Sequence, residues 1–376
     1  MNKNINILII FRIFRSSIAG YITVFLPLFL YNVLKLSLID IGILFALGSL
    51  FQSILSFFIG YLGDKYNKKK LLFYISLLFP LSLVILYFSS NIYLLIISFI
   101  LGGFGTVGAL AGGGVGAVVT PIMNSLITGY VNENREKIYS YFIIISGLSG
   151  SLGALLLFFY YKFVLIFGII ILLFSSLLLL KLDEPKEIII NNKEERKVEG
   201  LIILSGFLNG ASAGIIYNFL PIIFNHYLDF SKDQISLIYT ITGLISVISL
   251  YFIEKYINWN IFKKIVSFRI ISSIFLIIFL ISTIFVLSII SILSFIIYTT
   301  FRVASIPSQQ EVISENIGKR LSETFGANQS TRILGSFIFQ SLGGYLLSLS
   351  IIAPFLISSI FLSTSAFIYY KIRRMN

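Results

Sequence analysis

The chain has 376 residues, of which 57% are hydrophobic and only 12% charged, and its formal net charge is +12. Soluble globular domains carry about 25% charged residues, so this chain cannot cover a water-facing surface, and a large soluble protein is excluded. With no cysteine and a single histidine, His226, the chain offers no disulfide, no thiolate metal site and no histidine cluster for a metal. We therefore expect an integral membrane protein with no metal and no cofactor.

Apolar runs that are long enough to cross a membrane recur along the chain. A transmembrane helix needs about 20 consecutive apolar residues, and twelve such runs are found. The runs 71–119 and 264–310 contain very short connections and could be divided differently. The composition predicts an all-α protein with twelve transmembrane spans, at 6–33, 39–62, 71–89, 92–119, 138–160, 163–181, 201–225, 234–256, 264–282, 284–310, 320–348 and 351–371.

The basic residues between the spans gather on one side. Twelve spans put both termini on the same side, and the loops on the other side hold only Lys35, Lys162 and Lys232. Because positively charged loops stay in the cytoplasm, we expect a multi-pass protein of the cell membrane with both termini cytoplasmic. The expected surroundings are the lipid bilayer and a small-molecule substrate rather than nucleic acid, and the expected state is a monomer.

One long charged stretch, KLDEPKEIIINNKEERKVEG at Lys181–Gly200, divides the chain nearly in half. Six spans lie on each side of it. We expect an N-terminal six-helix bundle over 1–181, a cytoplasmic linker over 182–199 and a C-terminal six-helix bundle over 200–376.

The two halves contain a weak internal repeat. Shifting the chain by 194 residues superposes Phe25-Leu26-Pro27 of the first span on Phe219-Leu220-Pro221 of the seventh, and Pro121 near the end of span four has a counterpart in Pro307 near the end of span ten. A repeat of six spans preserves orientation, so an axis along the membrane normal relates the halves. Transporters in which two bundles rock about a central site have this architecture.

The loop after the second span reads GYLGDKYNKKK, from Gly60 to Lys70. It resembles the signature loop between spans two and three of the major facilitator superfamily, with a departure at Asn67, where the family prefers glycine and where asparagine tolerates a positive φ. The resemblance implies a transporter, and a latch in which Asp64 meets the N-terminus of span eleven, where a carboxylate is favoured. The alternative is a basic loop that only sets the topology. The latch residues that the resemblance implies are Gly60, Gly63, Asp64, Lys65, Lys68 and Lys69.

Two arginines, Arg302 and Arg332, lie deep within spans ten and eleven, and no acidic residue lies in the middle of any span. Ionisable groups within a membrane are functional candidates. The two guanidinium groups could bind an anionic group of a substrate, or they could bond carbonyl and amide groups of the protein. By resemblance, spans one, four, seven and ten line the cavity. The substrate-binding candidates are Arg302, Arg332, Asn209, Asn218, Tyr217, Tyr21, Tyr298 and Asn124.

Other polar residues lie nearer the ends of the spans. Arg12, Arg15 and Arg269 can reach the cytoplasmic surface with their long side chains, and Arg12 and Arg15 could instead line the cavity mouth. His226 and Asp229, at the outer end of span seven, could bind protons or form a solvated turn. The glycine-rich segment Gly102–Gly116 is expected to allow close helix packing and bending within span four.

These patterns favour secondary active or facilitative transport of a small organic solute, anionic or amphiphilic, by alternating access. The 37 phenylalanines and 21 tyrosines leave a drug-type exporter of lipophilic compounds as the alternative. A membrane-embedded enzyme is not expected, because no paired acids and no Ser/His or Cys/His set lie within the spans, so no catalytic residue is assigned. A non-transporting sensor would need a folded soluble domain, and the longest loop is the linker.

Overall fold

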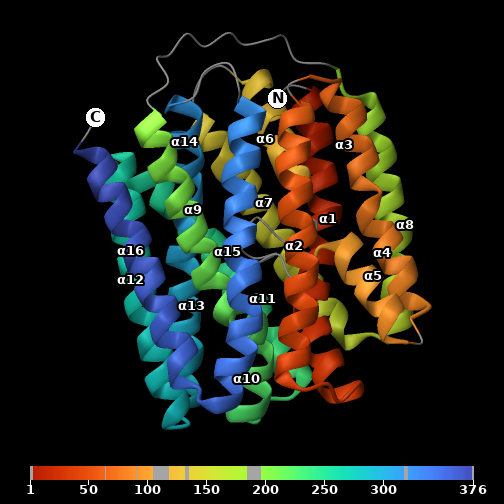
Figure 1. Ribbon diagram of the computed structural model, residues 1–376, viewed down its shortest axis with the longest axis vertical. Helices are drawn as coiled ribbons and strands as arrows, with labels where there is room; N and C mark the ends of the chain where they lie inside the picture. The colour runs from red at the N-terminus through yellow and green to blue at the C-terminus, as the bar shows by residue number, and fades with distance from the viewer. Residues whose placement is uncertain are drawn as a thin grey trace.

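The computed structural model describes residues 3–63, 65–89, 91–104, 118–131, 135–183, 196–316 and 321–374. Its helices run roughly along the long axis of the molecule, and both chain termini lie at the same end (Figure 1). We call this end the terminal end and the opposite end the distal end. The shared position of the termini is what an even number of spans requires.

Ten helical segments of the described residues are long and apolar enough to cross a membrane. The two remaining spans are the fourth, of which α5 and α6 are described, and the eleventh, which is α15. The chain is therefore an all-α integral membrane protein with twelve transmembrane spans in two six-helix bundles, as the composition predicted. The ten segments are Lys3–Val33, Leu38–Gly63, Lys68–Tyr87, Lys137–Phe158, Tyr161–Lys181, Val198–Tyr227, Lys232–Tyr256, Ile261–Ile284, Ser288–Ile313 and Ile352–Arg373.

Several spans consist of more than one helix. The α-helices of the first half are α1 (Lys3–Leu28), α2 (Leu38–Gly63), α3 (Lys68–Ser76), α4 (Leu78–Tyr87), α5 (Ile92–Gly102), α6 (Val119–Tyr130), α7 (Arg135–Ala154) and α8 (Tyr161–Leu178). Those of the second half are α9 (Arg196–Ile216), α10 (Leu220–Tyr227), α11 (Lys232–Tyr256), α12 (Ile261–Ile284), α13 (Ser288–Ala304), α14 (Ile306–Asn316), α15 (Leu321–Leu349) and α16 (Ile352–Arg373).

Prolines coincide with the breaks in the spans. Pro27 precedes a π-helical turn at Phe29–Val33, Pro221 follows a 3₁₀ turn at the start of α10, and Pro307 lies directly after the break between α13 and α14. Proline lacks an N–H donor and clashes with the preceding turn, so it interrupts the hydrogen-bond ladder of a helix. Pro27 and Pro221 are equivalent in the internal repeat, but the irregular turn follows Pro27 in the first span and precedes Pro221 in the seventh.

Span four differs from its predicted form. Its helix α5 ends at Gly102, and Gly103 has a φ of +63°, a left-handed conformation that favours glycine and ends the helix. The described helix thus stops where bending was expected, and residues 105–117, which hold most of the glycine-rich segment, lie outside the described part. The next described helix, α6, runs from Val119 to Tyr130, beyond the predicted end at residue 119.

Asn67 also behaves differently from the expectation. Its φ is −56°, and its side-chain oxygen accepts a hydrogen bond from the backbone N–H of Lys70 at 2.9 Å. It is therefore the N-cap of α3, a position that asparagine favours because its side chain satisfies a free N–H group. The left-handed turn that the sequence suggested at Asn67 is wrong.

The two halves pack against each other along α2 and α15, which lie side by side in Figure 1. Glycines allow this close approach. A Cβ atom on Gly326 would lie 2.8 Å from Cα of Gly60, and one on Gly344 would lie 2.4 Å from the carbonyl oxygen of Leu38. A side chain at these glycines would therefore force the helices apart near both ends of the contact.

At the distal end, polar groups join the halves. The Ser236 hydroxyl on α11 donates to the carbonyl oxygen of Ala154 on α7 at 2.9 Å, and Asn32 Nδ2 donates to Asn225 Oδ1 at 3.2 Å. The structure is thus held together across the halves at the end opposite the termini.

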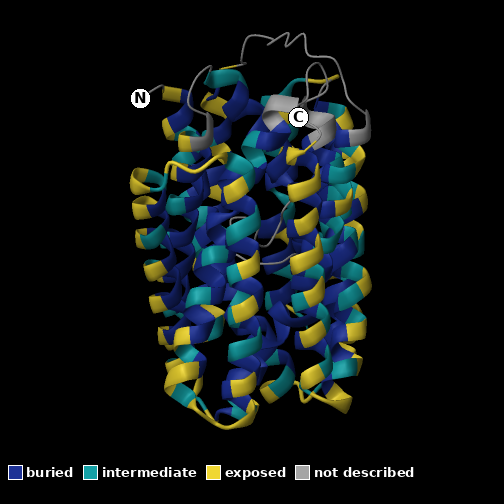
Figure 2. Ribbon diagram, turned by 90° about the vertical axis from the view of Figure 1, so that its left-hand side faces the viewer, coloured by how far each residue is buried: buried dark blue, intermediate teal, exposed yellow. Residues whose placement is uncertain are grey.

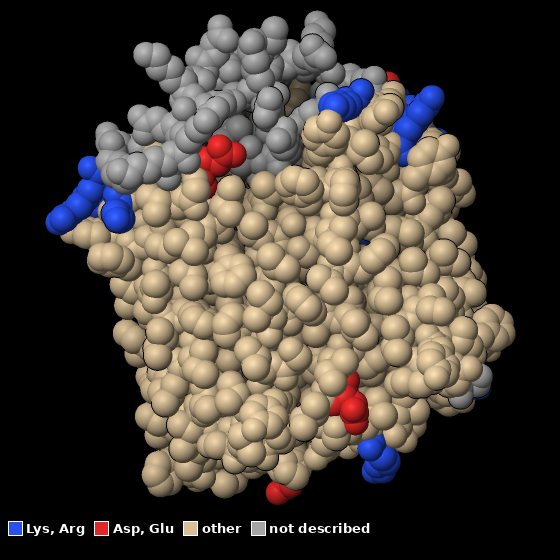
Figure 3. Space-filling view, in the orientation of Figure 1, with Lys and Arg blue, Asp and Glu red and all other residues tan. Residues whose placement is uncertain are grey.

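The outer surface is apolar and the charges lie at the two ends. Exposed residues gather on the outward faces of the helices (Figure 2), and on α8 they include Phe163, Ile170 and Phe174. Between the ends, the face in Figure 3 is almost free of charged residues. A surface of this kind faces lipid rather than water. Of the predicted linker over 182–199, residues 184–195 lie outside the described part, and α9 already begins at Arg196.

Candidate substrate site

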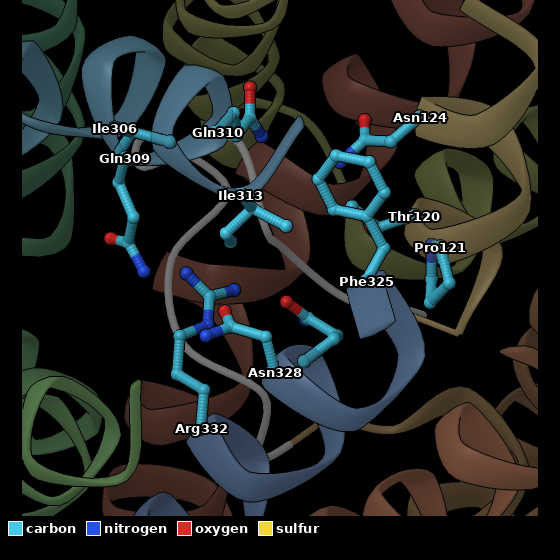
Figure 4. Close-up of a pocket in the computed structure, with 11 residues that line it drawn as sticks. Thr120, Pro121, Asn124, Ile306, Gln309, Gln310, Ile313, Phe325, Asn328 and Arg332 are labelled. Carbon is cyan, nitrogen blue, oxygen red and sulfur yellow. The ribbon is translucent and has the colours of Figure 1, made fainter. Parts of the chain in front are cut away.

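A pocket lies between the halves, in the part of the molecule toward the terminal end. It is formed by α6 from the first half and by α14 and α15 from the second (Figure 4). The cavity has a volume of about 40 Å³ in this conformation, which is room for a few water molecules. The described lining residues are Thr120, Pro121, Asn124, Ile306, Gln309, Gln310, Ile313, Phe325, Asn328, Gln329 and Arg332.

The internal repeat continues into the pocket walls. Pro121 pairs with Pro307 in the repeat, so Asn124 of α6 is the sequence equivalent of Gln310 of α14. The amide side chains of both residues line the pocket. Each of these helices is also the terminal-end segment of an interrupted span. The pocket therefore lies where the two halves contribute equivalent elements, as the central site of a two-bundle transporter would.

Arg332 is the cationic residue among the described lining residues. Its guanidinium group points into the pocket (Figure 4) and has no hydrogen bond or ion pair to any part of the chain that the structure describes. Arg302 and Arg269 lie within electrostatic range of it. An isolated charge at membrane depth costs at least about 2.5 kcal/mol, so the arrangement favours an anion beside Arg332.

The other polar side chains of the pocket are amides and the hydroxyl of Thr120. Asn328 Nδ2 donates to the carbonyl oxygen of Ile202 on α9 at 3.3 Å. Gln329, only 8% exposed, has a buried Nε2 with no partner among the described residues. No carboxylate occurs among the lining residues that the structure describes, so the pocket offers one positive charge together with neutral amide and hydroxyl groups.

Arg302 lies in a different, closed environment. It is 6% exposed, and its guanidinium donates to Tyr298 Oη at 2.7 Å, to the carbonyl oxygen of Asn209 at 3.0 Å and to Asn209 Oδ1 at 3.1 Å. The two bonds to Asn209 connect α13 to α9, and the bond to Tyr298 lies within α13. The structure therefore brings together Arg302, Tyr298 and Asn209, but it does not bring them to the pocket of Arg332 and Asn124.

The remaining substrate-binding candidates lie in the apolar core. Tyr21 stacks on Phe25 with ring centroids 5.0 Å apart, and Tyr217 is fully buried. Asn218 is also buried. None of these three is among the described residues that line the pocket, and their role in binding stays a prediction.

The arginines expected to reach the cytoplasmic surface are buried instead. Arg12 donates from Nε to the Ser146 hydroxyl on α7, and the Arg15 guanidinium lies 4.9 Å from the ring centroid of Phe79. Arg269 on α12 is 0% exposed. The surface-reaching interpretation is therefore wrong for all three, because neighbouring helices cover them and supply polar or aromatic partners.

His226 and Asp229 lie at the distal end. His226 is exposed and contacts the rings of Tyr31 and Tyr227 edge-on, with centroids 6.1 and 5.1 Å away. Asp229 is exposed and has a φ of 55°, as in a tight turn. The pocket lies toward the opposite end of the molecule. A proton-binding role for His226 and Asp229 stays a prediction.

The comparison with known families decides the identity of the fold. Residues 7–340 match the family model of the Major Facilitator Superfamily. The chain belongs to this superfamily. No curated protein matches the chain in sequence.

Solved structures of major facilitator transporters have the same fold. The human organic anion transporter MFSD10 (TETRAN) is 11% identical, with a TM-score of 0.70 over 99% of both chains. A D-xylose–proton symporter is 14% identical, with a TM-score of 0.72 over 98% of this chain and 97% of the other. The resemblance seen in the Gly60–Lys70 loop is thereby confirmed, and it points to a membrane transporter rather than an enzyme.

The structure describes most of the signature loop of the superfamily. Gly60 lies against Gly326 of α15, and Gly63 is buried. Lys65 is exposed beside the Tyr61 ring, and Lys68 Nζ donates to the Ser125 hydroxyl on α6 at 2.8 Å.

Lys69 is partly exposed, and Asp64 lies outside the described residues. The structure shows Gly60 in contact with α15, and the roles of this loop and of Asp64 as a latch stay predictions.

Sequence reasoning did not select Gln309, Gln310 or Phe325 for the site. A signal was present, because two adjacent amide pairs, Gln309-Gln310 and Asn328-Gln329, interrupt apolar spans ten and eleven. Side chains with amide groups are costly within a membrane unless they are hydrogen-bonded, so such pairs mark polar interiors. Their place in the pocket depends on the packing of α14 against α15.

Proposed function

We propose that this major facilitator transporter moves a small organic anion across the membrane, and that Arg332 binds the anionic group in the pocket between α6, α14 and α15. The observation that carries the proposal is the Arg332 guanidinium, which faces the pocket without an acceptor among the described residues. A guanidinium fork binds carboxylate or phosphate oxygens in a bidentate manner.

The proposed mechanism is alternating access, either facilitative or coupled to another solute. In this structure the halves are joined at the distal end by Asn32 and Asn225, while the pocket lies toward the terminal end. Pockets that hold drug-sized ligands have volumes of about 300–1,000 Å³, far more than the 40 Å³ of the described cavity, so binding requires the halves to separate at the terminal end. We propose that this end is cytoplasmic, because the positive loops lie there.

The test is a thermal-shift screen of purified protein against carboxylates, phosphate esters, sugars, amino acids and lipophilic cations. A ligand that binds the folded state raises its melting temperature. We expect stabilisation by one class of organic anion, which Arg332→Gln removes and which Arg374→Gln, the same change on an exposed arginine at the terminal end, leaves intact. Stabilisation by lipophilic cations alone, unchanged in Arg332→Gln, would favour a drug-type exporter and contradict the proposal.

A further inference from the structure

A second arginine lies behind the pocket wall. Arg269 on α12 is 0% exposed, and its Nη1 donates to the hydroxyls of Ser205 on α9 and Ser365 on α16, at 2.9 and 3.0 Å. Its guanidinium also lies 4.8 Å from the ring centroid of Tyr369. Arg269 is not among the described residues that line the pocket.

Arg269 is nevertheless connected to the pocket by one hydrogen bond. Its Nη2 donates to Gln309 Oε1 at 2.7 Å, and Gln309, 6% exposed, lines the pocket from α14. Arginine has only donors, whereas the end of a glutamine side chain has one acceptor oxygen and one donor nitrogen. Of the two ends of the Gln309 amide group, only the oxygen can accept this hydrogen bond, so the oxygen must face Arg269.

The fixed oxygen sets the direction of the amide nitrogen. In Figure 4 the nitrogen of Gln309 lies on the side of Arg332, while its oxygen is turned away from Arg332. No described residue accepts a hydrogen bond from this nitrogen. Arg269 thus presents an N–H donor of Gln309 to the space in front of Arg332 without entering that space itself.

The composition of the pocket fits such a role. Arg332, the nitrogen of Gln309 and the unpartnered Nε2 of Gln329 are all donors. A carboxylate or phosphate group offers several lone pairs, so one anionic head group can accept bonds from more than one of these residues. A cationic ammonium or guanidinium group, which has donors only, could not accept these bonds.

We infer that Gln309 donates a hydrogen bond to the anion held by Arg332, and that Arg269 is the positioning residue that orients Gln309 for this bond. Gln309 is then a determinant of anion selectivity, and the buried charge of Arg269 contributes to binding through it. The inference rests on the proposed function, because it concerns the same pocket.

Two near-isosteric variants separate binding from structure. Both Gln309→Glu and Gln309→Met remove the N–H donor. Gln309→Glu keeps an acceptor for Arg269 and adds an ion pair, while Gln309→Met removes the acceptor. Gln234→Glu is the matched control, because Gln234 is exposed at the start of α11 and accepts a hydrogen bond from the Ser231 N–H, which glutamate can also accept.

The measurement is binding of benzoate, an aromatic carboxylate chosen because Phe325 lines the pocket, together with the melting temperature of the ligand-free protein. We expect both variants to bind benzoate at least about tenfold more weakly, the effect of losing one hydrogen bond to a charged group. The melting temperature should stay equal or rise in Gln309→Glu and fall in Gln309→Met. Gln234→Glu should match the wild type in both measurements.

If Gln309→Glu bound benzoate with wild-type affinity, the inference would be overturned. It would also be overturned if only Gln309→Met, the variant expected to be less stable, lost affinity for benzoate. Arg332→Gln reports on the proposed function separately. If Arg332→Gln loses benzoate and Gln309→Glu does not, the inference falls and the proposed function stands. A wild-type protein that binds neither benzoate nor any other carboxylate or phosphate ester would overturn both.

Discussion

The surroundings of Arg302 and Arg332 differ, although both arginines lie deep in spans of the second half. Arg302 donates three hydrogen bonds to Tyr298 and Asn209, so the protein itself satisfies its charge with neutral acceptors. Arg332 has no such bonds among the described residues and faces a pocket. A buried arginine that the protein has already satisfied holds helices together, whereas one without acceptors has its hydrogen-bonding capacity left for a ligand.

The largest expected effect is on the stability of Arg302→Gln. The Tyr298 hydroxyl and the Asn209 side chain would lose a charged donor, and we expect the free energy of unfolding to fall by about 2–3 kcal/mol, since each such bond contributes about 1.5–3 kcal/mol and relief of the buried charge offsets part of the loss. Unfolding by dodecyl sulfate in mild detergent measures it. An unchanged stability together with a large loss of anion affinity would show that Arg302, too, is a ligand-binding residue.

A smaller effect is expected for Arg332→Lys. Lysine keeps the positive charge but loses the planar fork, so we expect anion affinity to fall by about 1–1.5 kcal/mol, roughly tenfold, with unchanged stability. Isothermal titration of benzoate into wild type and variant provides the comparison. A lysine variant that is as unstable as Arg302→Gln would mean that Arg332 is also held by the protein.

The smallest effect is expected for Tyr298→Phe. This change removes the hydroxyl that accepts from Arg302 Nη1 but keeps the ring, whose centroid lies 5.7 Å from the Arg302 guanidinium carbon. We expect a loss of about 1 kcal/mol in the free energy of unfolding, the typical contribution of one hydrogen bond, and no change in anion affinity. A change of affinity without a change of stability would contradict the separation of the two arginine environments.

The sequence predicts the spans well because membrane insertion depends on apolar length. It predicts the path of the chain within a span less well. The sequence does not reveal the end of α5 at Gly102, because apolar residues continue beyond it. The left-handed conformation of Gly103 becomes visible only in the backbone of the structure. The cap at Asn67 shows that one side chain suits two turn geometries, and the sequence does not choose between them.

The site is harder to predict than the fold. The sequence places Arg302 and Arg332 well inside helical spans, and the structure has them within α13 and α15. The number of acceptors around each guanidinium depends on contacts between helices that lie far apart in the chain, such as Asn209 of α9 with Arg302 of α13. The same limit explains why Arg269, eight residues into α12, was expected at a surface.

Arg269 also has a consequence for how the chain is made. Its serine and glutamine acceptors lie on α9, α14 and α16, and during translation α14 and α16 leave the ribosome after α12. When α12 first enters the bilayer, two of the three helices that satisfy its arginine do not yet exist. The apolar remainder of α12 must therefore carry the charge into the membrane, at a cost of about 2.5–3.5 kcal/mol. The acceptors on α14 and α16 become available to Arg269 only after these later helices have been made.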